Sequence, residues 1–178
     1  MNKIPKTHLN IEIKARCNEL EKIKVILQNL QADFKGIDHQ IDTYFNCIVG
    51  RLKLREGNIE RNLIHYNRPD GKQPKASIVT LEKVASDSNI KAVLTNALGV
   101  KIVVDKHRAI YFIDNVKFHL DRVADLGSFV EIEAIDVDGS IGKPKLEEQC
   151  AFYMDLFGIE EEDLVRVSYS DLLSNFEC

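Results

Sequence analysis

Charged side chains recur at every second position in five segments of this chain, and the positions between them are apolar. In the segment 50–56, Arg51, Lys53 and Arg55 alternate with Leu52 and Leu54. Because successive side chains of a β-strand point to opposite faces, each such segment predicts a strand with one charged and one apolar face. The charged positions of the other four segments are Glu12, Lys14 and Arg16; Lys106 and Arg108; Lys117, His119 and Asp121; and Glu131 and Glu133.

The remaining patterns predict the order of elements. Strands are expected over 8–17, 34–46, 50–56, 58–68, 77–83, 100–106, 108–114, 116–123 and 128–136. Helices are expected over 18–32, 87–98 and 143–157, with short helical pieces near 160–164 and 169–175. Two prolines and a glycine predict a loop over 67–77. Short connections favour antiparallel hairpins, so the class is α+β, with eight or so strands in a barrel or a strongly curved sheet.

The charged faces could point to water, as in an ordinary half-exposed sheet. Two features favour the lumen of a barrel instead. The carboxylates are grouped on the first and last strands, whereas the middle strands carry mostly cations. Three amphipathic helices also need an apolar sheet surface to cover. We therefore predict a closed eight-stranded antiparallel β-barrel with helices packed outside and a charged lumen.

The bulk composition narrows the function classes. A length of 178 residues predicts a single domain over 1–178 with its own core. A net charge of -4 argues against a nucleic-acid or membrane-surface binder. Four cysteines without metal-type spacing, no N-terminal apolar segment and no membrane-length apolar run predict a cytoplasmic protein.

A lumen of this kind has a predictable ligand chemistry. Lysine and arginine side chains that converge in a narrow space attract a polyanion, and arginine can contact phosphate in a bidentate way. Carboxylates in the same space repel one another unless a divalent cation lies between them, and Mg²⁺ or Mn²⁺ commonly bridges carboxylate to phosphate. The sequence has no Walker A loop, GxGxxG or HExxH motif. Metal-bound phosphates are therefore the expected ligand.

Six blocks, in order, resemble the CYTH family of class IV adenylyl cyclases and thiamine triphosphatases. The blocks are Glu12-Ile13-Lys14; Asp42-Thr43-Tyr44-Phe45; Arg51-Leu52-Lys53-Leu54-Arg55-Glu56; Tyr66-Asn67-Arg68-Pro69-Asp70 with Lys75 and Ser77; His119-Leu120-Asp121; and Phe129-Val130-Glu131-Ile132-Glu133. The resemblance spans about residues 8–172. It implies a triphosphate tunnel fold and Mg²⁺- or Mn²⁺-dependent chemistry on ATP, thiamine triphosphate or inorganic triphosphate.

The resemblance also implies roles for individual residues. Glu12, Glu131 and Glu133 would ligate the metal, and Asn10, which stands where the family has its first glutamate, is a further candidate ligand without the charge. The phosphates would be held by Lys14, Lys53, Arg55, Arg68, Lys106 and Arg108. Lys117, His119 and Asp121 would line the lumen near the reacting group. Lys75, in the predicted loop, would close over the substrate or simply be exposed.

Three functions remain open at this stage. The leading prediction is an enzyme that converts ATP to cyclic AMP and pyrophosphate, as class IV adenylyl cyclases do. The alternatives are a triphosphate hydrolase and a non-catalytic module that binds nucleotide or polyphosphate. In each case the expected partner is a small-molecule triphosphate, bound by a monomer or a homodimer, without nucleic acid or membrane.

Overall fold

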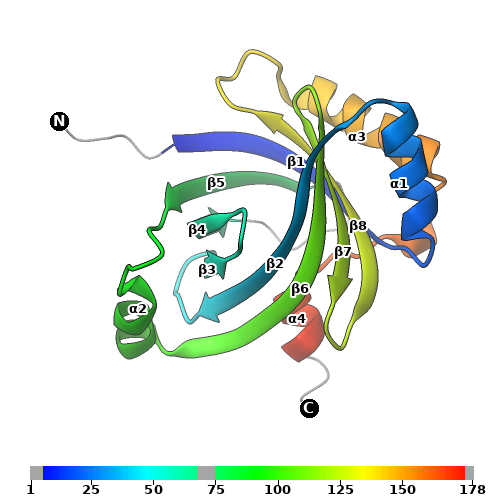
Figure 1. Cartoon of the computed structure of the whole chain (residues 1–178). Coiled ribbons are helices and arrows are strands. Elements are labelled where there is room, and N and C mark those ends of the chain that lie inside the picture. Colours follow the sequence, from blue (N-terminus) through cyan, green and yellow to red (C-terminus); the bar gives the residue numbers. More distant parts are fainter. Residues whose placement is uncertain (1–5, 68–74, 175–178) are drawn as a thin grey trace.

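Eight strands close into an antiparallel barrel (Figure 1), which confirms the predicted fold class. The computed structural model describes the backbone of residues 6–67 and 75–174. The strand order around the barrel is β1-β5-β4-β3-β2-β6-β7-β8, and pairing of β8 with β1 closes it. The strands are β1 (Lys6–Arg16), β2 (Asp33–Phe45), β3 (Arg51–Glu56), β4 (Arg61–Asn67), β5 (Lys75–Lys83), β6 (Val100–Ile113), β7 (Val116–Val123) and β8 (Gly127–Asp136).

Two of the helices cover one side of the barrel. They are α1 (Leu20–Asn29) and α3 (Lys143–Phe157), which lie together outside β1, β7 and β8 (Figure 1). Their buried side chains are Leu20, Ile23 and Leu27 from α1, and Leu146, Cys150 and Phe157 from α3. They pack on the apolar faces of the strands, and each buried aliphatic or aromatic side chain contributes about 1.5–3 kcal/mol. The main hydrophobic core therefore lies between the barrel wall and these helices.

The remaining helices are shorter. A 3-10 turn (Glu161–Asp163) leads to α4 (Tyr169–Ser174), which packs against β6. The helix α2 (Ile90–Leu98) connects β5 to β6 and buries none of its side chains, so it does not cover the sheet as the sequence pattern suggested. Within the described part of the chain, every helix is too short or too polar to span a membrane.

The first strand shows how the alternating pattern builds both sides of the wall. Ile11 and Ile13 belong to the core beneath the helices, whereas Asn10, Glu12 and Lys14 face the barrel interior. The same segregation on β7 and β8 gives this side of the barrel a charged interior and an apolar outer wall where the helices pack.

Two details of the predicted elements were wrong. The segments 100–106 and 108–114 form one strand, β6, because the alternation of buried and exposed residues continues through His107 without a turn residue. Lys75 lies in a strand instead of a loop: β5 begins there, and its backbone stands opposite that of Glu12 in β1. Pairing with β1 therefore extends β5 toward the two prolines beyond the limit that the local sequence suggested.

Candidate functional site

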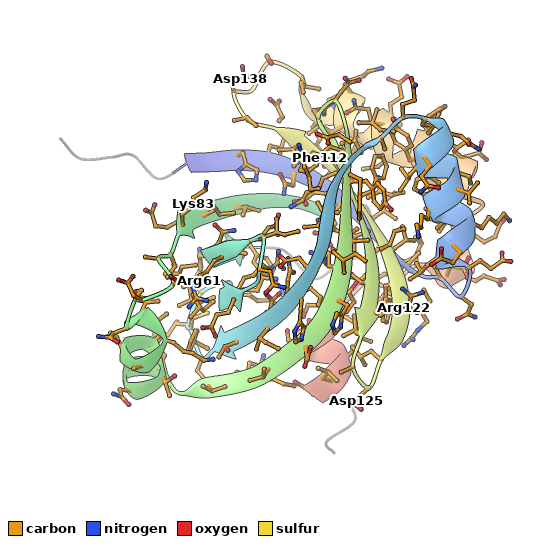
Figure 2. The ribbon with its side chains drawn as sticks, in the orientation of Figure 1. Arg61, Lys83, Phe112, Arg122, Asp125 and Asp138 are labelled. Atoms are coloured by element: carbon orange, nitrogen blue, oxygen red, sulfur yellow. The ribbon has the colours of Figure 1, made fainter. Side chains whose placement is uncertain are left out.

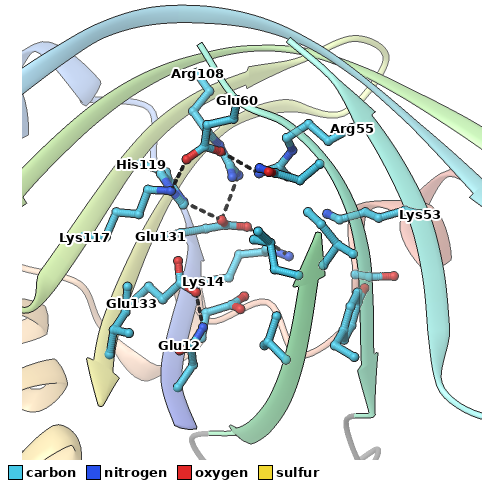
Figure 3. A pocket seen from close by; sticks show the side chains of 18 of the residues that line it. Glu12, Lys14, Lys53, Arg55, Glu60, Arg108, Lys117, His119, Glu131 and Glu133 are labelled. Carbon is cyan, nitrogen blue, oxygen red and sulfur yellow. Dashed lines mark hydrogen bonds and ion pairs between the residues drawn. The ribbon is translucent and has the colours of Figure 1, made fainter. Parts of the chain in front are cut away.

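The barrel encloses a cavity of about 520 Å³, and charged side chains from most of the strands point into it (Figure 3). The cations on its wall are Lys14, Lys53, Arg55, Lys106, Arg108 and Lys117, and the carboxylates are Glu12, Glu60, Glu131 and Glu133. His119 also lines it. The predicted lumen residues therefore converge on one space, with the exceptions given below.

Asp42, on β2, is the centre of the first group of cations. Its carboxylate accepts a bidentate pair of hydrogen bonds from Arg55, at 2.9 Å each, and single bonds from Lys53 at 2.9 Å and Lys106 at 2.7 Å. Burial alone would raise the pKa of Asp42, but Arg55, Lys106 and Lys53 together hold that pKa well below its usual range. One ionised carboxylate thus sets the positions of three cations.

Arg108, on β6, is the centre of the second group. It donates to Asp121 on β7 at 2.7 and 2.5 Å and to Glu131 on β8 at 2.7 Å. The buried Asp121 also accepts a 2.7 Å bond from the hydroxyl of Tyr169 in α4. Asp121 was predicted to line the lumen, but it lies behind the cavity wall, where it orients Arg108.

Glu60, in the turn between β3 and β4, links Arg55 of the first group to one further cation, Lys117. It forms ion pairs with Arg55, at 2.9 Å, and with Lys117. The turn is fixed by Asp38, whose carboxylate accepts the backbone N–H groups of Ile59 and Glu60 at 2.8 and 2.9 Å. Burial would raise the pKa of Glu60, but Lys117 and Arg55 lower it far below its usual value, so Glu60 stays ionised.

A cluster of oxygen-bearing side chains from β1 and β8 occupies another part of the wall. Glu12 and Glu133 stand opposite each other in the strand pairing, and Asn10 donates its amide N–H to Glu133. Burial and the neighbouring carboxylates Glu12 and Glu131 outweigh Lys117 and raise the pKa of Glu133 to about 7. Elsewhere in the cavity the carboxylates are paired with cations, whereas in this cluster the carboxylates lie next to one another.

The cluster fits a hard divalent cation. The amide oxygen of Asn10 is buried and finds no hydrogen-bond partner among the described residues, so an oxygen ligand is left over beside Glu133 and Glu12. Mg²⁺ and Mn²⁺ prefer such oxygen ligands. The fourth predicted ligand, Glu131, is nearby but already accepts bonds from Lys14 at 3.2 Å and from Arg108, which together hold its pKa well below the usual value.

His119 is buried in the wall next to Glu131. Its Nδ1 lies 3.0 Å from the Glu131 carboxylate, and its Nε2 is unpartnered within the part of the chain that the structure describes. Burial, then Arg108 and Lys117, lower the pKa of His119 to about 4. The imidazole is therefore neutral near pH 7, and when Nδ1–H donates to Glu131, Nε2 is left as a proton acceptor.

The structure does not describe the side chains of two predicted site residues, the phosphate ligand Arg68 and the loop residue Lys75. Arg68 lies outside the described residues, and of Lys75 only the backbone position in β5 is described. Among the residues that position the site's charged groups, three were not predicted to have a role there: Asp42, Glu60 and Tyr169. Asp42 shares the every-second-position signal with Asp38 and Gln40 on β2, and that alternation could have revealed it.

The barrel and its interior define the class of protein: a tunnel in which cations and carboxylates from many strands face one enclosed cavity. The chain belongs to the CYTH domain family, whose model matches residues 8–169. This confirms the resemblance that the six sequence blocks indicated.

Known relatives match along almost the whole chain. A Methanocaldococcus jannaschii protein that carries the provisional name adenylate cyclase is 25% identical over 175 residues, which cover 92% of this chain and 98% of that protein. A solved structure from Pyrococcus horikoshii OT3 has a TM-score of 0.74 at 28% identity and covers 92% of this chain and 98% of that one. A Hippeastrum structure has a TM-score of 0.64 at 11% identity, with 95% and 96% covered, which indicates a shared fold.

Proposed function

We propose that this chain is a metal-dependent enzyme that acts on a triphosphate in the barrel lumen, most like a class IV adenylyl cyclase. The observation that carries the proposal is the convergence of six cations on one cavity beside the oxygen cluster of Asn10, Glu12 and Glu133. Membership in the CYTH family and the name of the Methanocaldococcus jannaschii relative support it. We further propose that residues 1–178 act as one domain.

The cations form two groups, according to the carboxylate that each contacts in the structure. Lys53, Arg55 and Lys106 would contact phosphate oxygens by exchanging some of their bonds to Asp42, and Arg108 and Lys14 by exchanging bonds to Glu131. Arg68 is proposed as a further phosphate ligand. Arginine suits this role because its planar group matches two phosphate oxygens at once.

Glu12 and Glu133, with Glu131 and the amide oxygen of Asn10, would hold Mg²⁺ or Mn²⁺. When bound, the ion would neutralise phosphate charge and make phosphorus easier to attack. In the cyclase reaction, the 3′-hydroxyl of ATP attacks the α-phosphorus, pyrophosphate leaves, and the hydroxyl proton passes to a base. The neutral His119, with Nε2 unpartnered among the described residues, is the proposed proton acceptor, and Lys117 neighbours it.

The lumen also has an apolar part that favours an organic triphosphate. Ile64, Leu81 and Phe112 line the cavity together with the charged groups. Apolar side chains of this kind can pack against a base or a thiamine ring, but inorganic triphosphate has no surface to place there. ATP and thiamine triphosphate are therefore the preferred candidate substrates.

Hydrolysis of a triphosphate is the second candidate reaction. The Hippeastrum protein of the same fold is described as a provisional adenylyl cyclase with a dominant triphosphatase activity, so a cyclase name alone does not define the reaction. In hydrolysis, water attacks the terminal phosphorus and the diphosphate leaves, so the site does not have to position a ribose hydroxyl against the α-phosphorus. The same cations and carboxylates would serve either reaction.

The deciding experiment is to incubate the purified chain with ATP, thiamine triphosphate or inorganic triphosphate, each with Mg²⁺ or Mn²⁺, and to separate the products. Cyclic AMP with pyrophosphate would identify a cyclase, and phosphate release a hydrolase. The Glu12→Gln, Glu133→Gln double variant is the control and is expected to be inactive. Tight binding of all three ligands without turnover would leave a non-catalytic module, and the enzyme proposal would be abandoned.

A further inference from the structure

A second group of metal-ligating side chains lies on the outer face of the barrel, where β2 pairs with β6. His39 on β2 stands directly opposite His107 on β6, and their rings are stacked with centroids 4.3 Å apart and an interplanar angle of 1°. His39 Nε2 lies 2.8 Å from the Asp105 carboxylate, and one ligand atom from each of the three residues lies within 4.8 Å of the others.

We propose that His39, Asp105 and His107 form a binding site for a late first-row divalent cation such as Zn²⁺. Two imidazoles and one carboxylate are one of the ligand sets that Zn²⁺ takes in three-residue sites, with water in the fourth position. The same set suits Ni²⁺ and Cu²⁺ but not Mg²⁺, which prefers oxygen ligands only. The outer site therefore differs in metal preference from the oxygen cluster in the lumen.

The distances require only local adjustment. Tetrahedral Zn²⁺ with bonds of about 2.0–2.1 Å places its ligand atoms about 3.3 Å apart. Since the ligand atoms already lie within 4.8 Å, rotation about exposed side-chain bonds can close the site without moving the strands. The side chains of His39 and Asp105 are 44% and 49% exposed, so an ion can reach them from solvent.

The neighbouring cation does not close off the site. Arg122 on β7 stands opposite His107 in the strand pairing, but its guanidinium extends along the outer surface to Glu21, at 3.6 Å (Figure 2). Its side chain is 65% exposed and therefore well screened by water.

The outer site lies behind the phosphate-facing wall. His107 is flanked in the chain by Lys106 and Arg108, and His39 by Asp38 and Gln40, all of which point inward. An ion that bridges His39 and His107 would therefore tie β2 to β6 at the segment that carries two of the proposed phosphate ligands. The binding proposal itself does not depend on the proposed enzyme activity.

The test is calorimetric titration of the folded chain with Zn²⁺ in excess Mg²⁺, so that the lumen cluster is occupied. We expect one Zn²⁺ per chain, and a loss of affinity of at least about tenfold in His39→Ala and in His107→Ala. His65→Ala, which removes a histidine on β4 outside the site, is the matched control and should leave the titration unchanged. The Glu12→Gln, Glu133→Gln variant should also retain the site.

A second measurement uses the unaltered chain. Zn²⁺ should protect His39 and His107, but not His65, from diethylpyrocarbonate, as read by mass spectrometry of peptides. Absence of Zn²⁺ binding, equal affinity in the His39 and His107 variants, or loss of binding only in the lumen variant would each overturn the proposal. None of these results would affect the triphosphate assay.

Discussion

At the level of single residues, Asn10 is where the oxygen cluster has an amide instead of a carboxylate. Its N–H donates to Glu133, while its oxygen is buried without a partner in the described chain. The amide therefore relieves the repulsion between Glu12 and Glu133 and offers a neutral ligand atom. The proposed metal site therefore has one negative charge fewer but keeps an oxygen ligand at this position.

Asn10→Glu tests this balance between repulsion and metal binding. At pH 8 the metal-free variant should be less stable than wild type by about 1–3 kcal/mol, because a hydrogen-bond donor is lost and a third carboxylate is added. Mn²⁺ should then raise the melting temperature of Asn10→Glu more than that of wild type. Asn10→Ala removes the amide without adding charge, so Mn²⁺ should not raise its melting temperature more than that of wild type. Melts that Mn²⁺ leaves unchanged in all three proteins would contradict a metal site.

The raised pKa of Glu133 predicts a pH effect on stability without metal. Between its ordinary value of 4.5 and about 7, the folded protein keeps a proton that the unfolded chain has lost. This stabilising contribution is full below 4.5 and is lost as the pH rises through 7. The free energy of unfolding of wild type minus that of Glu133→Gln should therefore fall by up to about 3 kcal/mol over this window.

Urea unfolding of both proteins at a series of pH values measures that difference. The comparison is needed because His119, whose pKa is lowered to about 4, has the opposite effect in both proteins. Its contribution rises with pH between about 4 and 6.5, and subtraction removes it. A difference that stays flat from pH 4 to 8 would mean that Glu133 is ionised throughout.

Lys53 and Arg108 should respond differently to truncation. Lys53→Ala leaves Asp42 with Arg55 and Lys106, so the fold should tolerate it, while triphosphate binding weakens by about 1.5–3 kcal/mol. Arg108→Ala leaves Asp121 and Glu131 without their main partner, and should destabilise the protein by about 3–5 kcal/mol. Calorimetry with Mg²⁺ and triphosphate measures the first change and urea unfolding the second. Unchanged affinity in a folded Lys53→Ala would remove it from the site.

At the level of elements, the sequence predicted the strands better than their connections. Strict alternation located β1, β3, β7 and β8 and assigned their charged faces to the lumen. It could not show that Asp42 would meet three cations from two strands, because that depends on strand register. The role of Tyr169 was also out of reach, because α4 is 48 residues away from Asp121 in the chain.

The contact of α4 with the barrel gives a test at this scale. The Tyr169 ring packs against Phe129 at 5.0 Å and beneath the Lys14 ammonium at 4.0 Å, and its hydroxyl donates to Asp121. Tyr169→Phe keeps both ring contacts and should cost about 1–3 kcal/mol of unfolding free energy through the lost hydrogen bond. Tyr153→Phe, on the outer helix α3, is the control. Equal stability of wild type and Tyr169→Phe would mean that Arg108 alone satisfies Asp121.

At the level of the whole molecule, the charge is distributed unevenly. The chain carries a formal net charge of -4, yet six cations face the cavity against four carboxylates. We expect triphosphate with Mg²⁺ to raise the melting temperature, with about 2.7 kcal/mol of stabilisation at a ligand concentration 100-fold above Kd. The shift should decrease with added salt. A melting temperature that does not respond to ligand would rule out a preformed triphosphate site.

The internal pairing of these cations has a consequence for selectivity. The arginines and lysines already form ion pairs with carboxylates of the wall, namely Asp42, Asp121, Glu60 and Glu131. An incoming anion must therefore exchange with these carboxylates to reach the cations. An incoming anion gains only the difference between its own contacts and those it displaces. A monophosphate offers too few charges to compete with several tethered carboxylates, whereas a linear chain of phosphates can displace them together. The preference for longer phosphate chains would then arise because the ligand competes with the wall carboxylates for the same cations. No residue would need to contact the end of the chain.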